Sequence, residues 1–333
     1  MTEKLQDNKP TWEIFKGNDE YWDLVLDDFP LKGYLNTVSW GMHLSNLGWK
    51  ILRLELSNLK KPVAYCQIFI KSYPFGIGVV FIPDGIIGDY KYLSSLQYDL
   101  TRILGLRFCY VRLRESKALH ADDCIKFFAA GWERPIYCRA TGLTMTLDIS
   151  GTMEQIKSGF FKNWRKALKK SLKAPFEIVE FRDVKSIAKL YFELKKLKNL
   201  SVGEIYSEDY IKSLLDTHKD KLIVLGAIDC NGDLVSIRGA ICHKLNATDM
   251  IAATSTVGRS LSASNAVLFD LLKFCKSKGC ISYDLNGIDP KSGKGVYQFK
   301  KGTGSKAKAG LGEFEWSNSK ILKWAFNFFM KYR

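Results

Sequence analysis

The sequence lacks the features of several large classes of protein. No apolar run in its 333 residues approaches the roughly 18 residues that a membrane-spanning helix requires. The first residues, Met1 to Lys9, are polar and do not contain the apolar centre of a secretory signal peptide. We therefore expect a globular protein of the cytoplasm.

Patterns that bind metals or form disulfides are also missing. Histidine occurs only 4 times, at widely separated positions, and the 8 cysteines show no C-x-x-C pairing. The sequence therefore predicts no metal site and no disulfide framework. No local Ser-His-Asp or Cys-His motif is present, so nothing in the sequence favours covalent nucleophilic catalysis.

Acidic residues are scarce relative to basic ones. The chain has 50 Lys and Arg against 35 Asp and Glu, a formal net charge of +15. Such an excess favours phosphate-rich partners such as tRNA, nucleotide-sugars or anionic lipid headgroups, although lysines that serve only solubility would give the same number. With 46% apolar residues, the length allows two domains, each with its own core.

The order of predicted elements indicates an α/β fold. Alternating apolar patterns predict antiparallel strands over Lys50–Leu56, Val63–Lys71 and Ile77–Ile82, and helices and further strands follow as far as Asp148. In the second half, two apolar runs flank Asn231-Gly232, a strong signal for a β-hairpin. These patterns predict mixed, mainly antiparallel sheets flanked by helices.

A strongly basic helix is predicted from Phe160 to Lys173. At 3.6 residues per turn its apolar side chains fall on one side, and the other side carries Lys162, Arg165, Lys166, Lys169, Lys170 and Lys173 without an acid. A solvated face is one interpretation of this row. Binding of an anionic partner is the other, because like charges at i,i+4 spacing repel one another unless they are neutralised.

The densest pattern runs from Gly279 to Lys306. A short strand and the turn Asn286-Gly287-Ile288-Asp289-Pro290 come first, and we expect a loop rich in Gly and Lys around Phe299 and Lys300. Lys300 could stabilise the oxyanion of an acyl transfer, and Phe299 could limit water beside it. Asp289 is a candidate for receiving the amine proton, but Asp in such a turn more often holds its own backbone. A hairpin with solvated lysines is the alternative for this stretch.

The same stretch resembles the Fem-type aminoacyltransferases, which build the interpeptide bridges of peptidoglycan. The resemblance rests on Y-D-L-N-G-I-D-P and G-V-Y-Q-F-K-K-G-T-G, on the Trp40-Gly41 region, and on Arg165 and Lys169, which match the family's basic helix. It implies two tandem acetyltransferase-like (GNAT) domains, residues 1–142 and 143–315, and a last helix, 316–333, that packs back on the first domain. It also implies that Phe299 and Lys300 belong to the active site. For the last helix, contact with a membrane surface is the alternative.

Other positions depart from the family's pattern. Leu44 stands where the family commonly has a Lys, and Tyr206 replaces the Arg of an Arg-x-x-x-Tyr motif whose Tyr is Tyr210. Arg259, beside Gly258, only partly matches the loop that holds coenzyme A in ordinary acetyltransferases. We assign substrate binding to Arg165, Lys169, Tyr206, Tyr210, Tyr73 and Arg259.

The resemblance implies an N-acyltransferase with no bound cofactor. Its expected donor is aminoacyl-tRNA, and its expected acceptor is an amine of a nucleotide-linked or lipid-linked envelope precursor, either a peptidoglycan stem peptide or an amino sugar of a surface glycan. A transferase that uses acyl-CoA on an amino sugar is one alternative. A non-catalytic module that binds tRNA or envelope components is the other. The oligomeric state stays open.

Overall fold

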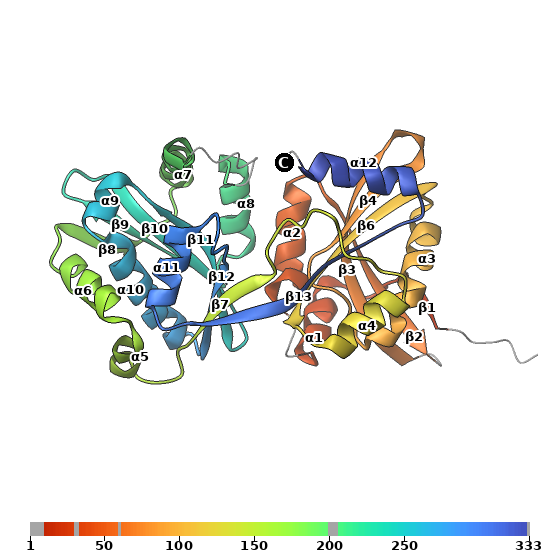
Figure 1. The fold of residues 1–333 in the computed structure, drawn as a ribbon, viewed down its shortest axis with the longest axis horizontal. Helices are drawn as coiled ribbons and strands as arrows, with labels where there is room; N and C mark the ends of the chain where they lie inside the picture. Colours follow the sequence, from red (N-terminus) through yellow and green to blue (C-terminus); the bar gives the residue numbers. More distant parts are fainter. Residues whose placement is uncertain (1–9, 30–32, 59–60, 199–205, 332–333) are drawn as a thin grey trace, which may run out of the picture. The chain divides into compact units, whose positions relative to one another are not determined.

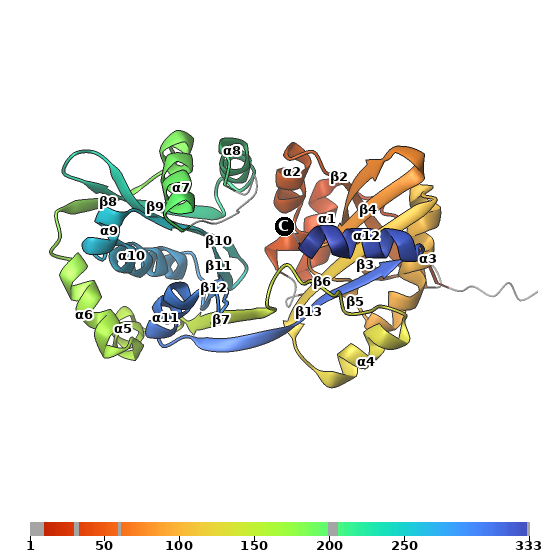
Figure 2. The same cartoon turned by 45° about the horizontal axis from the view of Figure 1, so that its top comes forward.

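The computed structural model describes residues 10–29, 33–58, 61–198 and 206–331 (Figures 1 and 2). The polar start, Met1 to Lys9, lies outside these residues. The chain divides into two compact units, of which unit 1 contains Met1–Gly142 with Ala309–Arg333 and unit 2 contains Leu143–Lys308. The sequence-based boundary at residue 315 thus falls inside a segment that lies with unit 1.

Six strands of unit 1 lie side by side in the sheet, and β5 lies off this order and pairs with β3. The order is β1-β2-β3-β4-β6-β13, and the only parallel pair along it among the described residues is β4 with β6. The elements are β1 (Thr11–Ile14), α1 (Asp19–Asp27), α2 (Val38–Asn46), β2 (Lys50–Asn58), β3 (Lys61–Tyr73), β4 (Ile77–Ile82), β5 (Ile87–Gly88), α3 (Leu93–Leu104), β6 (Phe108–Ala118), α4 (Ala121–Ala129), β13 (Lys306–Ser317) and α12 (Lys320–Lys331).

The two faces of this sheet are covered by different helices. Leu96 and Leu100 of α3 and Phe127 of α4 pack in one cluster with alternate residues of β3 and β6. Tyr65, on the opposite face of β3, packs instead with Trp22 of α1. The three predicted strands appear as the antiparallel β2, β3 and β4. Period-2 alternation in the sequence therefore located this sheet correctly.

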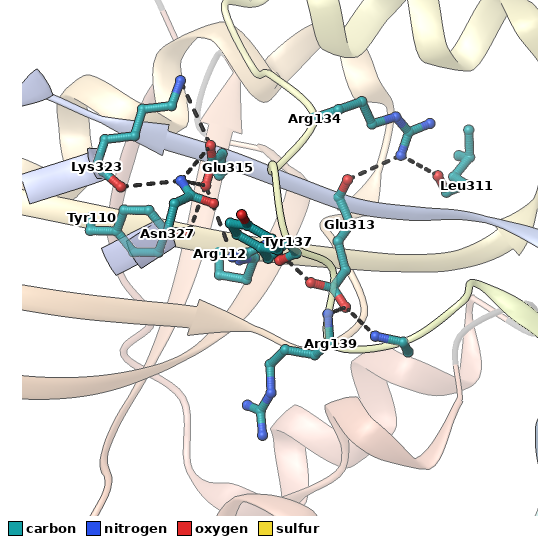
Figure 3. A network of polar contacts seen from close by, with 11 residues as sticks. Tyr110, Arg112, Arg134, Tyr137, Arg139, Leu311, Glu313, Glu315, Lys323 and Asn327 are labelled. Atoms are coloured by element: carbon teal, nitrogen blue, oxygen red, sulfur yellow. Dashed lines mark hydrogen bonds and ion pairs between the residues drawn. The ribbon is translucent and has the colours of Figure 1, made fainter. Parts of the chain in front are cut away.

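A buried network of hydrogen bonds holds helix α12 against β6 and β13 of unit 1 (Figure 3). Asn327 Nδ2 donates to both carboxylate oxygens of Glu315 at 3.1 and 2.9 Å, and Tyr110 Oη donates to the same carboxylate at 2.7 Å. The Phe326 ring stacks on Tyr110 with 4.0 Å between centroids. Arg112 Nη1 donates to Glu313 at 3.2 Å. Because these polar groups are buried, their hydrogen bonds fix one position of the helix on β6 and β13.

Unit 2 contains a second set of six strands with its own helices. Its sheet has the order β7-β12-β11-β10-β9-β8. The elements are β7 (Leu143–Asp148), α5 (Met153–Gly159), α6 (Lys162–Ser171), β8 (Phe176–Glu180), α7 (Val184–Lys198), α8 (Glu208–Thr217), β9 (Leu222–Asp229), β10 (Leu234–His243), β11 (Asn246–Thr254), α9 (Thr256–Ser260), α10 (Ala263–Ser277), β12 (Ser282–Gly287) and α11 (Lys294–Gly302).

Helices also cover both faces of the second sheet. Trp164 and Leu168 of α6 pack with α10 over β9 and β10, whereas α7 and α8 lie over the other face (Figures 1 and 2). The predicted Asn-Gly hairpin is present as β9 and β10, and Gly232 has the positive φ of 83° that this turn requires. Both units thus have the predicted α/β architecture of mainly antiparallel sheets.

Candidate active site

The two parallel strands of unit 2 pair only at their beginning. Asn246–Thr248 of β11 pair with Ser282–Asp284 of β12, yet β11 continues to Thr254 and β12 to Gly287. Asp249 is thus the first residue of β11 after the pairing ends. Polar side chains from β10, β11, β12 and α11 meet there, and we take this point as the centre of the candidate site.

A buried ion pair lies at this centre. Arg238 Nη1 of β10 donates to Asp249 Oδ2 at 2.8 Å, and both side chains are almost fully buried. Tyr283 Oη donates to the other carboxylate oxygen at 3.0 Å. Burial raises the pKa of Asp249, while the nearby positive charges of Arg238 and Lys300 oppose that rise. The carboxylate is therefore held by a fixed set of partners.

Lys300 points its amine at the end of β12. Its Nζ donates to the carbonyl oxygens of Gly287 at 2.7 Å and Asn286 at 3.2 Å. Burial lowers the pKa of this amine, Asp249 raises it, Arg238 lowers it and Asp284 raises it. A lysine ammonium has three N–H donors, so the two carbonyls leave one for another acceptor.

The prediction of a loop around Lys300 is wrong, because residues 294–302 form helix α11. The backbone N–H of Tyr297 donates to the carbonyl of Gly293, which begins the helix. Glycine is favoured at position 302, the last residue of the helix, because a side chain there would meet Trp164 of α6 at 2.7 Å. Close packing of α11 on α6, and not loop flexibility, therefore accounts for this glycine.

Phe299 precedes Lys300 and is half-buried against the core of unit 2. The Arg238 guanidinium lies over its ring at 5.1 Å from the centroid, and the Trp164 ring is 5.8 Å away. A cation over an aromatic face is attracted to it. Phe299 therefore contacts both the Arg238 guanidinium and the apolar core, and it precedes Lys300 in the helix.

Asp289 is a partly exposed turn residue. Its carboxylate accepts from the backbone N–H groups of Lys291 at 2.8 Å and Ser292 at 3.1 Å, and from the Ser292 hydroxyl. These hydrogen bonds, first those from Ser292, lower its pKa. A carboxylate with a lowered pKa is a weaker base, so the geometry favours the turn-forming role over proton transfer.

Three tyrosines extend the polar cluster toward α7 and α8. Tyr206 stacks on Tyr191 at 3.9 Å between centroids, and Tyr210 meets Tyr206 edge-on at 5.7 Å. Tyr206 has the unusual positive φ of 75°, so the backbone is strained where this ring is placed. Burial raises the pKa of all three tyrosines, which keeps their hydroxyl groups neutral donors.

Comparison with known proteins decides the family resemblance. Residues 228–331, from β9 to α12, match the FemAB family. This part of the chain is therefore similar to the FemAB family. A crystal structure of FemX superposes with a TM-score of 0.78 at 13% sequence identity, covering 95% of this chain and 100% of that one. The predicted resemblance and the acyltransferase class are thereby confirmed.

Two further solved structures share the fold. A tandem GNAT protein from the clavulanic acid biosynthesis pathway matches with a TM-score of 0.57 at 9% identity, covering 93% of this chain and 99% of that one. L-PGS from Bacillus licheniformis matches with a TM-score of 0.54 at 12% identity, covering 93% and 96%. The predicted tandem acetyltransferase-like fold is therefore confirmed. No curated protein sequence matches significantly.

The predicted basic helix is present as α6, although it is shorter than expected. Trp164 and Leu168 are buried as predicted, but Phe161 and Leu172 lie just outside the helix ends and are exposed. Arg165 is exposed, yet its Nη1 donates to the carbonyls of Ser158 at 2.8 Å and Phe160 at 2.6 Å, which anchors it to the preceding segment. Lys169 is an exposed residue of the same helix.

The remaining predicted binding residues, Arg259 and Tyr73, lie on elements other than the four that form the cluster around Asp249. Arg259 is an exposed residue of the short helix α9. Gly258 beside it is explained by packing, since a side chain there would meet the carbonyl oxygen of Val235 at 2.2 Å. Tyr73 is the last residue of β3 and belongs to unit 1. Within unit 2, the structure brings Phe299 and Lys300 to the cluster and leaves Arg165, Lys169 and Arg259 outside it.

Sequence reasoning missed Arg238, Asp249 and Tyr283. A signal did exist, because Arg238 interrupts the apolar run L-V-S-I-R-G-A-I and a charge buried in a strand needs a partner. The identity of that partner depends on strand register. The register of β10 and β11 shifts between Gly239 and Ala240, and that irregularity cannot be read from composition.

No helix within the described parts of the chain has the length and apolar character needed to cross a membrane.

Proposed function

We propose that this Fem-like protein transfers an aminoacyl group from an aminoacyl-tRNA to an amine of a cell-envelope precursor in the cytoplasm. The FemAB match supports an aminoacyltransferase of envelope synthesis. The tRNA donor and the precursor are our proposal. The acceptor is a peptidoglycan stem peptide or an amino sugar of a surface glycan.

The reaction requires a neutral amine, a stabilised oxyanion and a protonated leaving group. The amine nitrogen attacks the ester carbonyl, the C–N bond forms, and the carbonyl oxygen becomes negatively charged. The C–O bond to the ribose then breaks, and the amine's proton passes to the leaving oxygen. A fixed positive charge in a dry site stabilises the oxyanion most effectively.

The observation that carries the proposal is the position of Lys300. Its ammonium is buried at the place where β11 and β12 stop pairing, and two carbonyls hold it there. The ion pair of Arg238 and Asp249 lies beside it and couples to its charge. Lys300 can therefore offer its third N–H to an oxyanion without first reorganising.

The basic face of α6 supports tRNA as the donor. Lys166 and Lys169 are exposed on this helix, which contains no acidic residue, and Lys170 Nζ donates to the carbonyl of Ser260 at 2.7 Å. Phosphate groups would relieve the repulsion within this row. We assign Lys166 and Lys169 to phosphate contacts.

A coenzyme A donor receives less support. The backbone N–H of Gly258 donates to Ser255 Oγ at 3.0 Å, and that of Arg259 donates to the Ser255 carbonyl at 3.0 Å. A pyrophosphate cradle needs backbone N–H groups that point to the ligand. In this stretch the amides of Gly258 and Arg259 are used within α9 instead.

The test is a donor experiment with the full-length chain. The protein is incubated separately with labelled aminoacyl-tRNA and labelled acyl-CoA, each with stem-peptide and amino-sugar acceptors, and the products are identified by mass. We expect transfer from aminoacyl-tRNA that Lys300→Ala slows and Lys301→Ala, a change of the exposed neighbouring lysine, leaves intact. Transfer from acyl-CoA alone would contradict the proposed donor, and transfer from neither would favour a non-catalytic module.

A further inference from the structure

Strand β12 is irregular near its end. Asp284 lies opposite Thr146 of β7 and Gly287 lies opposite Thr144, so β12 has one residue more than its neighbour between these two pairs. Such an extra residue is a β-bulge, which breaks the regular alternation of a strand. Within the bulge, Asn286 adopts the positive φ of 66°. Most side chains disfavour this left-handed region, whereas Asn tolerates it.

The bulge explains how one amine reaches two neighbouring carbonyls. In a regular β-strand, the carbonyls of successive residues point to opposite edges. The Nζ of Lys300 nevertheless donates to the carbonyls of both Asn286 and Gly287. This double contact is possible because the strand departs from regular geometry at this point. The backbone at Asn286 must therefore keep its conformation if Lys300 is to make both hydrogen bonds.

The hydrogen bonds of Asn286 hold the bulge to both neighbouring strands. Its Nδ2 donates to the carbonyl of Asp249 at 3.0 Å, directly after the backbone pairing of β11 with β12 ends. Its Oδ1 accepts from the backbone N–H of Gly287 at 2.7 Å. Its own backbone N–H donates to Asp284 Oδ1 at 2.7 Å, and the Thr144 hydroxyl of β7 donates to the same oxygen. These contacts fix the bulge between β11 and β7.

The two carbonyls also bear on the charge of Lys300. Acceptors that contact an ammonium group stabilise it relative to the neutral amine. Lys300 is only 6% exposed, so burial lowers its pKa, and the carbonyls replace part of the water that the group has lost. If the carbonyls moved away, the pKa of Lys300 would fall further. Less of the amine would then carry a positive charge at a given pH.

We propose that Asn286 is a positioning residue, whose left-handed conformation and two side-chain hydrogen bonds aim the carbonyls of Asn286 and Gly287 at Lys300. Asn suits this position because it combines tolerance of a positive φ with one amide donor and one amide acceptor. Gly would supply the conformation without the hydrogen bonds. The use of the held ammonium in transfer rests on the proposed function, but the positioning itself does not.

The test follows the titration of Lys300 without turnover. The full-length protein is treated with a trace of labelled acetic anhydride at a series of neutral to alkaline pH values, and acetylation of each lysine is quantified by mass spectrometry. Because only the neutral amine reacts, the labelling rate rises as pH passes through the pKa of Lys300. The exposed Lys301 serves as the internal reference.

Two variants separate the contributions of Asn286. Asn286→Ala removes both side-chain hydrogen bonds and disfavours the left-handed conformation. Asn286→Gly removes the same hydrogen bonds and keeps that conformation accessible. Asn246→Ala is the matched control, because Asn246 is an exposed residue at the other end of the pairing between β11 and β12. Thermal melting confirms that each variant folds.

We expect the labelling midpoint of Lys300 in Asn286→Ala to lie about one pH unit or more below that of the parent, because the ammonium loses hydrogen bonds. Below the midpoint, Lys300 should therefore be labelled about tenfold faster than in the parent. Asn286→Gly should shift the midpoint in the same direction by a smaller amount. Asn246→Ala should leave it unmoved, and Lys301 should be labelled alike in all variants.

An unmoved or raised midpoint in folded Asn286→Ala would overturn the proposal. If that variant does not fold, an unmoved midpoint in Asn286→Gly would overturn it equally. An equal shift in Asn246→Ala would also do so, because the change would then reflect a general loosening of unit 2.

Transfer assays on the same variants keep the proposed function separate. A lowered midpoint together with a kcat reduced about tenfold or more, at little change in KM, would support both proposals. A lowered midpoint with normal transfer by Lys300→Ala would support the positioning by Asn286 and contradict the proposed role of Lys300.

Discussion

The ion pair of Arg238 and Asp249 should control both the stability of unit 2 and the protonation of Lys300. Asp249→Ala removes the carboxylate and leaves the Arg238 guanidinium buried without its partner. Such a loss costs about 3–5 kcal/mol of the free energy of unfolding. Asp249→Asn keeps an acceptor for Arg238 and Tyr283 but removes the charge. It should cost about 1.5–3 kcal/mol of the free energy of unfolding, the range for hydrogen bonds to charged groups.

The same change should move the pH dependence of transfer. Burial lowers the pKa of Lys300, and Asp249 is the first influence that raises it. Removing the negative charge therefore lowers that pKa further. If the ammonium form of Lys300 stabilises the oxyanion, activity falls as pH rises through its pKa. In Asp249→Asn this alkaline limb should lie about one pH unit or more below the parent's.

The assay is kcat/KM for transfer from aminoacyl-tRNA, measured across pH for parent and variant, with urea unfolding at neutral pH. Asp270→Asn is the matched control, because Asp270 forms a partly exposed pair with Lys273 on α10. It should cost under about 1 kcal/mol and leave the alkaline limb unmoved. An unmoved limb in folded Asp249→Asn would refute the coupling between Asp249 and Lys300.

Three further predictions concern other parts of unit 2. Burial lowers the pKa of His218 to about 4 from 6.5, so the free energy of unfolding of the parent should fall by about 3 kcal/mol as pH falls from 6.5 to 4. Urea unfolding of His218→Gln should show no such pH dependence, and an equal pH dependence in this variant would assign it to other groups. The double variant Lys166→Ala/Lys169→Ala should flatten the log-log salt dependence of tRNA binding by about one unit per lost phosphate contact and spare single-turnover chemistry, whereas a full salt slope would mean a solvated face. Gly258→Ala should lower stability by about 1–3 kcal/mol in thermal melts, because its Cβ would meet the Val235 carbonyl at 2.2 Å; an unchanged melting temperature would mean that α9 shifts freely.

Much of the fold could be predicted because strand and hairpin signals are local. Alternation over Val63–Lys71 and the Asn231-Gly232 turn each determine an element without reference to distant residues. The segment around Lys300 was misjudged for the opposite reason. Gly295, Gly302 and Gly304 suggest a loop, but packing of α11 on α6 and the turn at Asp289 outweigh that composition.

The candidate site was predicted only in part, because its members come from separate strands. Phe299 and Lys300 were predicted from a local sequence pattern that resembles the Fem-type family. Asp249 and Tyr283 are 34 residues apart, and their contact exists only through the pairing of β11 with β12. Tyr191 likewise becomes visible only when α7 places its ring on Tyr206. Contacts of this kind depend on register and helix docking, which single-sequence patterns do not determine.

The most direct test of the account is steady-state transfer by Lys300→Ala, measured beside Lys301→Ala. If the Lys300 ammonium stabilises the oxyanion, Lys300→Ala should lower kcat by about 10²–10³-fold, the usual effect of losing one such donor, while KM barely changes. Lys301→Ala should behave as the parent. Normal turnover by a folded Lys300→Ala variant would contradict the account, because the buried amine would then only hold the carbonyls of Asn286 and Gly287.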